Sequence, residues 1–283
     1  MTRSLLRILA VGVCLLSAAL SATPVDDKKM TKMLKAGGAT LALAAQPMWF
    51  FGEAMGHPSC YPTSATDVQG SQTPSVDLCM YPDTGCGCRQ AGVKAGKPGP
   101  SFPVYYSFKQ CNATEVRVAY NLFYEKDGCK PNGLNGHPYD WERVIVVWGK
   151  GNDTKWVPSR LMLSQHMGYQ TLSWDNIAST FNTGDAKFSR GGRDGHRGRD
   201  HAKVYVSWSK HAHYHDQLTG WHDPLSQLTG LAHRSDDWWY FPVKGDYVLA
   251  DGSTSIGATL ASFEWGSADS FPGKVHEGLC EAH

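Results

Sequence analysis

Short runs of β-branched and aromatic residues recur along this chain, with glycine-, proline- and asparagine-rich segments between them. Such runs are typical of β-strands, and the intervening residue types are typical of turns. Long stretches with helical periodicity are scarce, so the pattern predicts an all-β protein folded as a β-sandwich. The strand-like runs lie at 104–108, 115–124, 143–148, 171–174, 204–208 and 246–250.

Length and charge narrow the class of protein further. The 283 residues are enough for one sizeable domain after a short N-terminal segment is set aside. Lysine and arginine number 27 and aspartate and glutamate 26, which gives a formal net charge of +1. A near-neutral chain lacks the basic surface that attracts nucleic acid, so no nucleic acid is expected as a partner.

The first residues have the pattern of a secretory signal peptide. Arg3 and Arg7 come before an apolar run at 8–20, which is followed by the small residues Ser21 and Ala22. The run is too short for a transmembrane helix, and cleavage near Ala22 is expected. We therefore predict a signal peptide at 1–22 and a soluble, secreted, extracellular mature protein.

Residues 23–45 have the character of a leader to the main domain, which we expect to span 46–283. Four lysines interleave with apolar residues in this segment, and Gly37 and Gly38 follow them. One interpretation is a short basic amphipathic helix that lies on a membrane surface. A flexible terminal segment is the favoured interpretation, because chain termini are usually loose.

Seven cysteines remain after the predicted signal peptide, which is an odd number. Most of them should pair in an oxidising compartment, and none has a spacing typical of zinc ligands. We expect three disulfides and one thiol; the sequence leaves the pairing open, with Cys111–Cys129 as one guess. Asn112 and Asn152 begin Asn-X-Thr sequences and are predicted sites of N-glycosylation. The cysteines are Cys60, Cys79, Cys86, Cys88, Cys111, Cys129 and Cys280.

A glycine- and asparagine-rich loop that begins at Asn132 leads into the strand-like run at 143–148, and His137, Asp140 and Glu142 stand at their junction. Side chains alternate between the faces of a strand, so Asp140 and Glu142 should point the same way, about 7 Å apart. Two carboxylates beside an imidazole are ligands that a divalent cation takes. The alternative is that these groups are solvated or cap the turn.

Residues Gly136-His-Pro-Tyr-Asp-Trp-Glu142 resemble the signature of the necrosis- and ethylene-inducing-like proteins, Gly-His-Arg-His-Asp-Trp-Glu, at five of seven positions. Upstream, 118–127 resembles the strand and the Lys-Asp pair that precede the signature in that family. Three further segments resemble the family in the expected order, and the resemblance extends from about residue 46 to the C-terminus. They lie at 163–166, 206–212 and 265–268.

The resemblance implies a β-sandwich with a few peripheral helices, similar to the actinoporins and some fungal lectins. It also implies a divalent cation in a shallow acidic cavity, with ligands on Asp127, His137, Asp140 and Glu142. Oxygen-rich coordination favours Mg²⁺ or Ca²⁺. Trp141 should point away from these carboxylates and pack in the core. Family members bind the sugar head group of plant sphingolipids and damage the plasma membrane, so we expect a monomeric cytolysin that is not an enzyme.

Two positions depart from the family's signature. Pro138 stands in place of the usual arginine, so a cation and a backbone donor are lost and the loop is stiffer. Tyr139 stands in place of a second histidine and lacks imidazole chemistry. Because the four ligands remain, we predict that the cation is still bound. A non-cytotoxic, lectin-like family member is the alternative.

His211, His213 and His215 alternate along the chain and would share one face of a strand. Three such histidines can hold zinc with an open coordination position, which makes a secreted zinc-dependent hydrolase the alternative of a different class. No glutamate stands near them in a recognised zinc-protease pattern. The other interpretation is a histidine-rich strand end whose charge changes below neutral pH.

Overall fold

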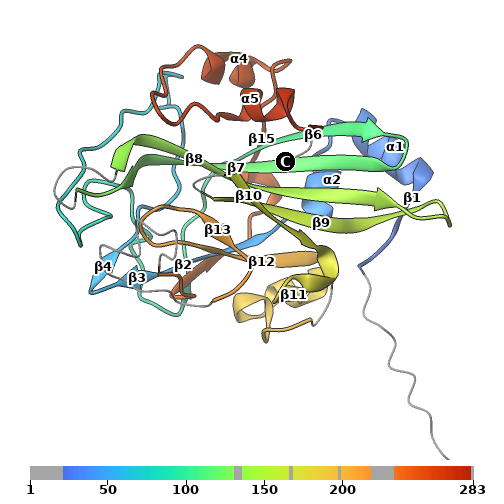
Figure 1. Ribbon diagram of the computed structural model, residues 1–283, viewed down its shortest axis with the longest axis horizontal. Coiled ribbons are helices and arrows are strands. Elements are labelled where there is room, and N and C mark those ends of the chain that lie inside the picture. The colour runs from blue at the N-terminus through green and yellow to red at the C-terminus, as the bar shows by residue number, and fades with distance from the viewer. Residues whose placement is uncertain (1–21, 131–135, 166–167, 197–198, 218–232, 282–283) are drawn as a thin grey trace, which may run out of the picture.

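The computed structural model describes residues 22–130, 136–165, 168–196, 199–217 and 233–281 (Figure 1). The predicted signal peptide at 1–22 lies outside these residues except for Ala22, and so does the loop at 132–135. Two sheets carry most of the described elements, which confirms the all-β class. None of the helices in the described ranges is long and apolar enough to cross a membrane.

The larger sheet is built round a long antiparallel hairpin. β7 (Glu115–Gly128) and β8 (Gly136–Lys150) pair along nearly their whole length, and their β-branched and aromatic residues favour extended backbone. In the described chain this sheet has seven strands in the order β1-β9-β8-β7-β6-β15, with β10 paired to β9. The remaining strands are β1 (Val25–Asp26), β6 (Val104–Asn112), β9 (Lys155–Gln165), β10 (Gly168–Ser173) and β15 (Tyr247–Leu249).

The smaller sheet has six strands within the described residues, in the order β11-β12-β2-β14-β5, with β13 paired to β12. β2 (Met48–Phe51) lies at its centre, parallel to β12 (His201–Val206) and antiparallel to β14 (Trp238–Tyr240). The other elements are β5 (Lys97–Pro98), β11 (Thr180–Phe181), β13 (His213–Tyr214) and the separate short hairpin of β3 (Glu53–Ala54) and β4 (His57–Pro58).

The main hydrophobic core lies between the two sheets. Trp49 and Phe51 of β2 belong to the same buried cluster as Tyr120 and Leu122 of β7, and the Trp49 and Tyr120 rings meet edge to face at 6.4 Å. Each sheet therefore presents an apolar face to the other, as expected of the predicted β-sandwich. The relation to the actinoporins stays a prediction.

Short helices cover the outer face of the larger sheet. α4 (Ser255–Ala261) and α5 (Pro272–Glu277) lie together over it (Figure 1). Next to α4, Trp265 packs against Phe123 and Trp141, so this cluster backs the β7–β8 hairpin from outside. The 3-10 helices are η1 (Trp174–Asn176), η2 (Thr183–Lys187), η3 (Ser189–Gly191) and η4 (Lys244–Asp246).

The segment 23–45 differs from the flexible leader that its position suggested. It forms β1 and the helices α1 (Asp27–Lys35) and α2 (Ala39–Ala44). Asp26 caps α1 by accepting a hydrogen bond from Lys29 N at 2.8 Å, and Met30 and Met33 are buried in the main core. Burial of this apolar face outweighs the usual looseness of a terminus, so the folded unit begins before residue 46.

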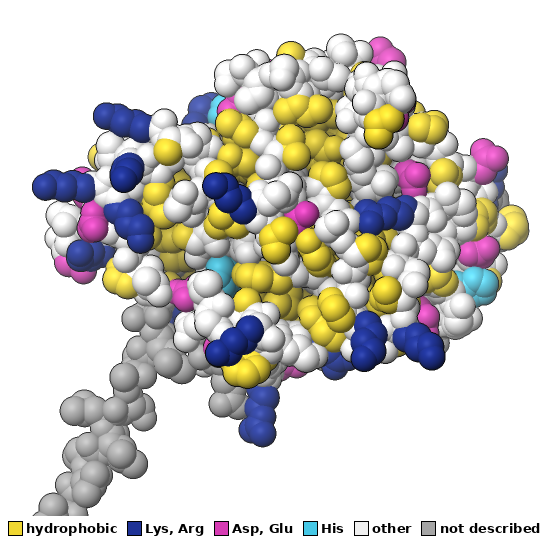
Figure 2. Space-filling model, turned by 180° about the vertical axis from the view of Figure 1, so that it is seen from behind, with side chains coloured by type: hydrophobic (Ala, Val, Ile, Leu, Met, Phe, Trp, Pro, Cys, Tyr) yellow, Lys and Arg dark blue, Asp and Glu magenta, His cyan; other side chains and the backbone are white. Residues whose placement is uncertain are grey.

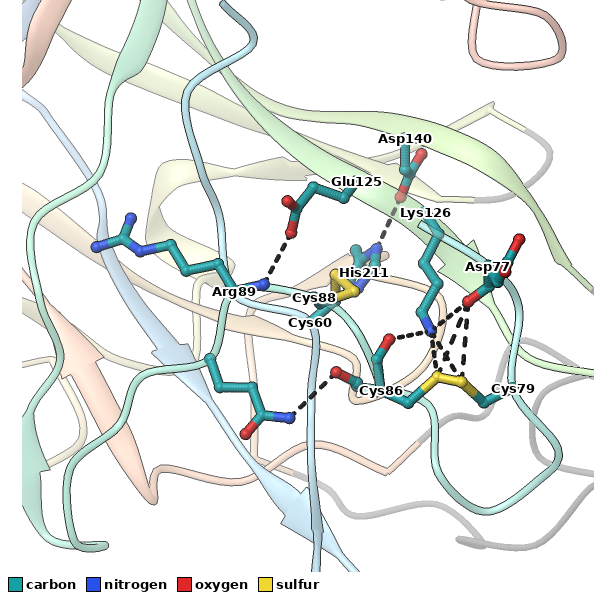
Figure 3. Close-up of a disulfide and its surroundings, with 12 residues drawn as sticks. Cys60, Asp77, Cys79, Cys86, Cys88, Arg89, Glu125, Lys126, Asp140 and His211 are labelled. Carbon is teal, nitrogen blue, oxygen red and sulfur yellow. Dashed lines mark hydrogen bonds and ion pairs between the residues drawn. A yellow bond between two sulfur atoms is a disulfide. The ribbon is translucent and has the colours of Figure 1, made fainter. Parts of the chain in front are cut away.

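Three disulfides are present among the described residues: Cys60–Cys88, Cys79–Cys86 and Cys111–Cys280. Cys129 is buried and lies outside them, so the expected count is confirmed. The guess of Cys111–Cys129 is wrong, because Cys111 ties β6 to the C-terminal segment instead. The first two bridges staple the loop region between β4 and β5 (Figure 3).

Charged side chains of both signs lie on the face of the molecule seen in Figure 2, where Asp and Glu side chains lie among the Lys and Arg side chains. Asn112 and Asn152 are both exposed. Both can therefore be reached by a glycosyl transferase, and their glycosylation stays a prediction.

Candidate cation site

The β7–β8 register brings the predicted ligands to one end of the hairpin. Asp127 of β7 lies opposite His137 of β8, and Tyr124 lies opposite Asp140. In an unbroken strand the side chains of His137 and Asp140 would point to opposite faces. Tyr139 between them has a φ of 57°, in the left-handed region, and this break in the alternation lets both side chains face the same cavity.

A polar cavity of about 240 Å³ lies at this end of the sheet. All four residues predicted as cation ligands line it, and Asp140 and Glu142 share a face as the strand alternation predicted. Lys210 and Arg143 also line it, although neither was predicted. The complete lining is Asp127, His137, Asp140, Trp141, Glu142, Arg143, Ser164, Gln165, Gly168, Tyr169, Lys210, Ser267, Ala268 and Ser270.

Asp127 is buried and already has two nitrogen-bearing neighbours. Lys210 Nζ donates to Asp127 Oδ2 at 2.9 Å, and His137 Nε2 lies 3.5 Å from the same oxygen. The other oxygen, Asp127 Oδ1, is buried and has no hydrogen-bond partner among the described residues. A buried carboxylate oxygen without a donor is costly, so an additional positive group would stabilise it.

Asp140 lies beside His211 (Figure 3). His211 Nδ1 is 2.9 Å from Asp140 Oδ2, and the His211 ring stacks on Tyr124 with centroids 3.9 Å apart. Burial, followed by the nearby Asp127 charge, raises the pKa of the Asp140 carboxyl well above its ordinary value. Burial lowers the pKa of His211 to about 4. The imidazole is therefore neutral at pH 7. His211 contacts Asp140 without bringing a positive charge to it.

Glu142 is held by Ser164, whose hydroxyl donates to Glu142 Oε2. Burial, followed by the Asp140 charge, raises the pKa of the Glu142 carboxyl to about 8. Arg143 borders the same cavity and is fixed by Nη2 donating to Trp141 O at 2.7 Å. The cavity thus concentrates acidic groups that repel one another.

The signature residues outside the ligand set have structural roles. Trp141 is buried and packs against Tyr105 and Trp265, which confirms its predicted place in the core. The Tyr139 ring packs against Trp265 with centroids 5.4 Å apart. Gly136 is required by close packing, because a Cβ there would lie 2.5 Å from Asp127 O.

The donor set fits a hard divalent cation. Ligand atoms of Asp127, Asp140 and His211 all lie within 4.8 Å of one another. The other groups of such side chains in the described residues each contain a disulfide-bonded cysteine pair. Carboxylate oxygens with one imidazole suit Mg²⁺ or Ca²⁺, and the unpartnered Asp127 Oδ1 is suited to such a role. His211 was missed as a neighbour of this site, although its segment at 206–212 resembled the family.

The three alternating histidines do not form a zinc site in the described structure. β13 contains only His213 of the three, so the expectation of one shared strand face is wrong. His211 lies in the preceding turn with a φ of 52° and contacts Asp140. His215 Nδ1 instead accepts a hydrogen bond from Ala178 N at 3.1 Å. The backbone turn at His211 separates side chains that a regular strand would have aligned.

The sequence model of the family described as Necrosis inducing protein (NPP1) matches residues 54–232, which is more than half of the chain. The chain belongs to the necrosis-inducing protein family. Within that match lie β7, β8 and the turn that carries Lys210, so the whole acidic part of the cavity comes from the family region. Trp265 and α5 lie beyond it and pack on the outer side of the same hairpin.

Solved structures of the necrosis-inducing type resemble the chain at low identity. The non-toxic HaNLP3 protein has 17% identity and a TM-score of 0.45, covering 87% of this chain and 86% of that chain. NLPPya in complex with glucosamine has 16% identity and a TM-score of 0.47, with 84% and 86% covered. Necrosis and Ethylene inducing Protein 2, from the causal agent of cocoa's Witches Broom disease, has 15% identity and a TM-score of 0.42, with 80% and 91% covered. No curated protein matches the chain. The family assignment rests on the sequence match.

Proposed function

We propose that this protein is a secreted cytolysin that binds Mg²⁺ or Ca²⁺ and, with it, the sugar head group of plant sphingolipids at the outer membrane surface. The observation that carries the proposal is that Asp127, His137, Asp140 and Glu142 all line one polar cavity. The family membership supports the same activity. Membrane damage through binding requires no turnover, so the proposal is a toxin and not an enzyme.

The residues of the cavity lining support the proposed binding of such a head group. Asp127 and Asp140 would hold the cation, with Glu142 and His137 beside it. A hard divalent cation supplies coordination positions that accept hydroxyl oxygens of a sugar. Hydroxyl and amide groups elsewhere in the lining, from Ser164, Gln165, Tyr169, Ser267 and Ser270, would hydrogen-bond the remaining sugar hydroxyls. The cavity is smaller than typical drug-sized pockets, which suits a single sugar unit.

A non-cytotoxic, lectin-like activity is the second candidate, and the two departures from the signature favour it. Pro138 is exposed and Tyr139 packs inward, and neither lines the cavity. They therefore leave the proposed ligands in place but change the surface next to the cavity mouth. A change there would alter how the protein meets the membrane more than whether it holds a cation.

Dye leakage from vesicles containing glycosylinositol phosphorylceramide tests the proposal, with leaf infiltration of the same purified proteins alongside. Wild type should release dye and cause necrosis with Mg²⁺ or Ca²⁺ present, and EDTA should abolish both. Glu142→Gln and Asp140→Asn each replace a carboxyl group by an amide of nearly the same size. Each should reduce leakage by about tenfold or more, the effect usually seen when a metal site loses a supporting group.

Glu53→Gln on β3 is the matched control, because it makes the same change at an exposed carboxylate outside the cavity. It should leave leakage unchanged. Vesicle binding that depends on the cation but produces no leakage would assign the lectin-like activity instead. Leakage that resists EDTA and persists in Asp140→Asn would refute the cation-dependent mechanism.

A further inference from the structure

Lys210 brings a positive charge to the same carboxylate that the proposed cation would use. Its Nζ donates to Asp127 Oδ2 at 2.9 Å, and only 12% of its side chain is exposed. The Asp127 side chain is 5% exposed. Solvent and salt screen such a pair less than one on the surface, so the Lys210 charge acts strongly on any ion that approaches Asp127.

Backbone hydrogen bonds fix Lys210 in this place. Gly128 N, at the end of β7, donates to Ser209 O at 2.9 Å. On the other side of Lys210, His211 N donates to Ser207 O at 3.2 Å, which closes a tight turn. The turn that presents the ammonium group is therefore bonded directly to the strand that presents its carboxylate partner.

The same turn engages both aspartates of the site. Lys210 contacts Asp127, and the next residue, His211, contacts Asp140 at 2.9 Å. The two neighbours differ in kind, since one is an imidazole ring and the other an ammonium group. Within the described contacts of this turn, a lysine therefore pairs with Asp127, whereas a histidine contacts Asp140.

The cavity lining brings acidic and basic side chains together. It holds the carboxyl groups of Asp127, Asp140 and Glu142 and the basic side chains of Lys210 and Arg143. A divalent cation between the two aspartates would meet the ammonium group as a like charge at short range. It would have to displace that group from Asp127 Oδ2 or use Oδ1, which has no hydrogen-bond partner among the described residues.

We propose that Lys210 is a built-in competitor that weakens the binding of Mg²⁺ and Ca²⁺ at this site. The proposal rests on the proposed cation site and adds a residue that sets its affinity. It makes the site weak and reversible, in the range of about 10⁻⁴–10⁻³ M that extracellular calcium modules show. The cation-free cavity is then stabilised by the protein's own ammonium group.

Calorimetric titration of Mg²⁺ and Ca²⁺ into the full mature protein tests this role. Lys210→Met keeps an unbranched side chain one heavy atom shorter than lysine and removes its charge, so it should bind both ions about tenfold more tightly or better. Lys210→Arg keeps the charge and should bind no more tightly than wild type. Lys97→Met, which changes an exposed lysine on β5, is the matched control and should bind as wild type does.

Thermal unfolding with and without Ca²⁺ gives a second readout, and Lys210→Gln is a second uncharged variant if Lys210→Met does not fold. The uncharged variants should gain more in Tm from Ca²⁺ than wild type gains. If wild type binds the cations and the uncharged variants bind them equally or more weakly, the proposed role of Lys210 is overturned and the cation site stands. Binding by neither protein would overturn it together with the proposed cation site. Binding by the uncharged variants only would support the competitor and refute cation binding by wild type.

Discussion

His201 on β12 is a buried histidine whose ring is satisfied on both sides. Its Nδ1 donates to Gln46 O at 2.9 Å, and its Nε2 accepts from Thr183 Oγ1 at 2.8 Å. Burial lowers the pKa of this imidazole to about 4, against an ordinary value of 6.5, while the adjacent Asp200 acts in the opposite direction. The folded protein therefore holds the neutral ring across the range where an exposed histidine takes up a proton.

The pH dependence of stability should report this residue. Between pH 6.5 and about 4 the unfolded chain protonates His201 and the folded chain does not. The contribution of His201 is therefore complete above pH 6.5 and falls as the pH falls, by up to about 3 kcal/mol. His201→Gln should lose that part of the slope in urea unfolding, and His196→Gln, at an exposed histidine, is the control. An unchanged slope in His201→Gln would contradict the prediction.

At single residues, strand alternation was predictable from the sequence and irregular backbone was not. Asp140 and Glu142 share a face as alternation requires, and Trp141 packs on the other side. The left-handed φ of Tyr139 was not predictable from its residue type, because such values are uncommon outside glycine and asparagine. The left-handed residue lies between His137 and Asp140, which both line the cavity.

The helix α1 is the element whose role changed most between sequence and structure. Met30 and Met33 lie on its buried face, and Lys28 lies on its exposed face. Met30→Ala should lower the free energy of unfolding by about 2–3 kcal/mol, because it leaves a cavity in the main core. Lys28→Ala should change it by less than about 0.5 kcal/mol. Chemical unfolding of both variants checks this, and equal small effects would mean that α1 is only loosely attached.

No local sequence pattern predicted the contacts between elements that are far apart in the sequence. Lys210 and His211 reach the hairpin from a turn before β13, and His211 lies 71 residues from its contact Asp140. The alternating histidine pattern was apparent from sequence, but the turn that breaks it depends on hydrogen bonds formed only in the folded chain. The local pattern therefore predicted that the three histidines share one face. In the structure, His211 contacts Asp140 of the acidic cavity instead.

For the whole molecule, the sequence was sufficient for the all-β class and for placing His137, Asp140 and Glu142 together at one cavity. The count of three disulfides could be inferred from the odd number of cysteines, whereas their pairing required the fold. Cys280 reaches Cys111 because the C-terminal segment folds back over the outer face of the larger sheet, where Leu279 packs against Ile145. Which sheet a terminal segment packs against depends on the whole fold, so short-range sequence patterns carry little information on it.

The central claim is that the acidic cavity at the end of the β7–β8 hairpin binds a divalent cation. Crystals of the mature protein soaked in Mn²⁺, a stand-in for Mg²⁺ with anomalous scattering, test it most directly. We predict one anomalous peak in the cavity, within coordination distance of Asp127 and Asp140, and its loss in Asp140→Asn. A cavity without a peak at millimolar Mn²⁺, or a peak on His213 or His215 instead, would contradict the claim.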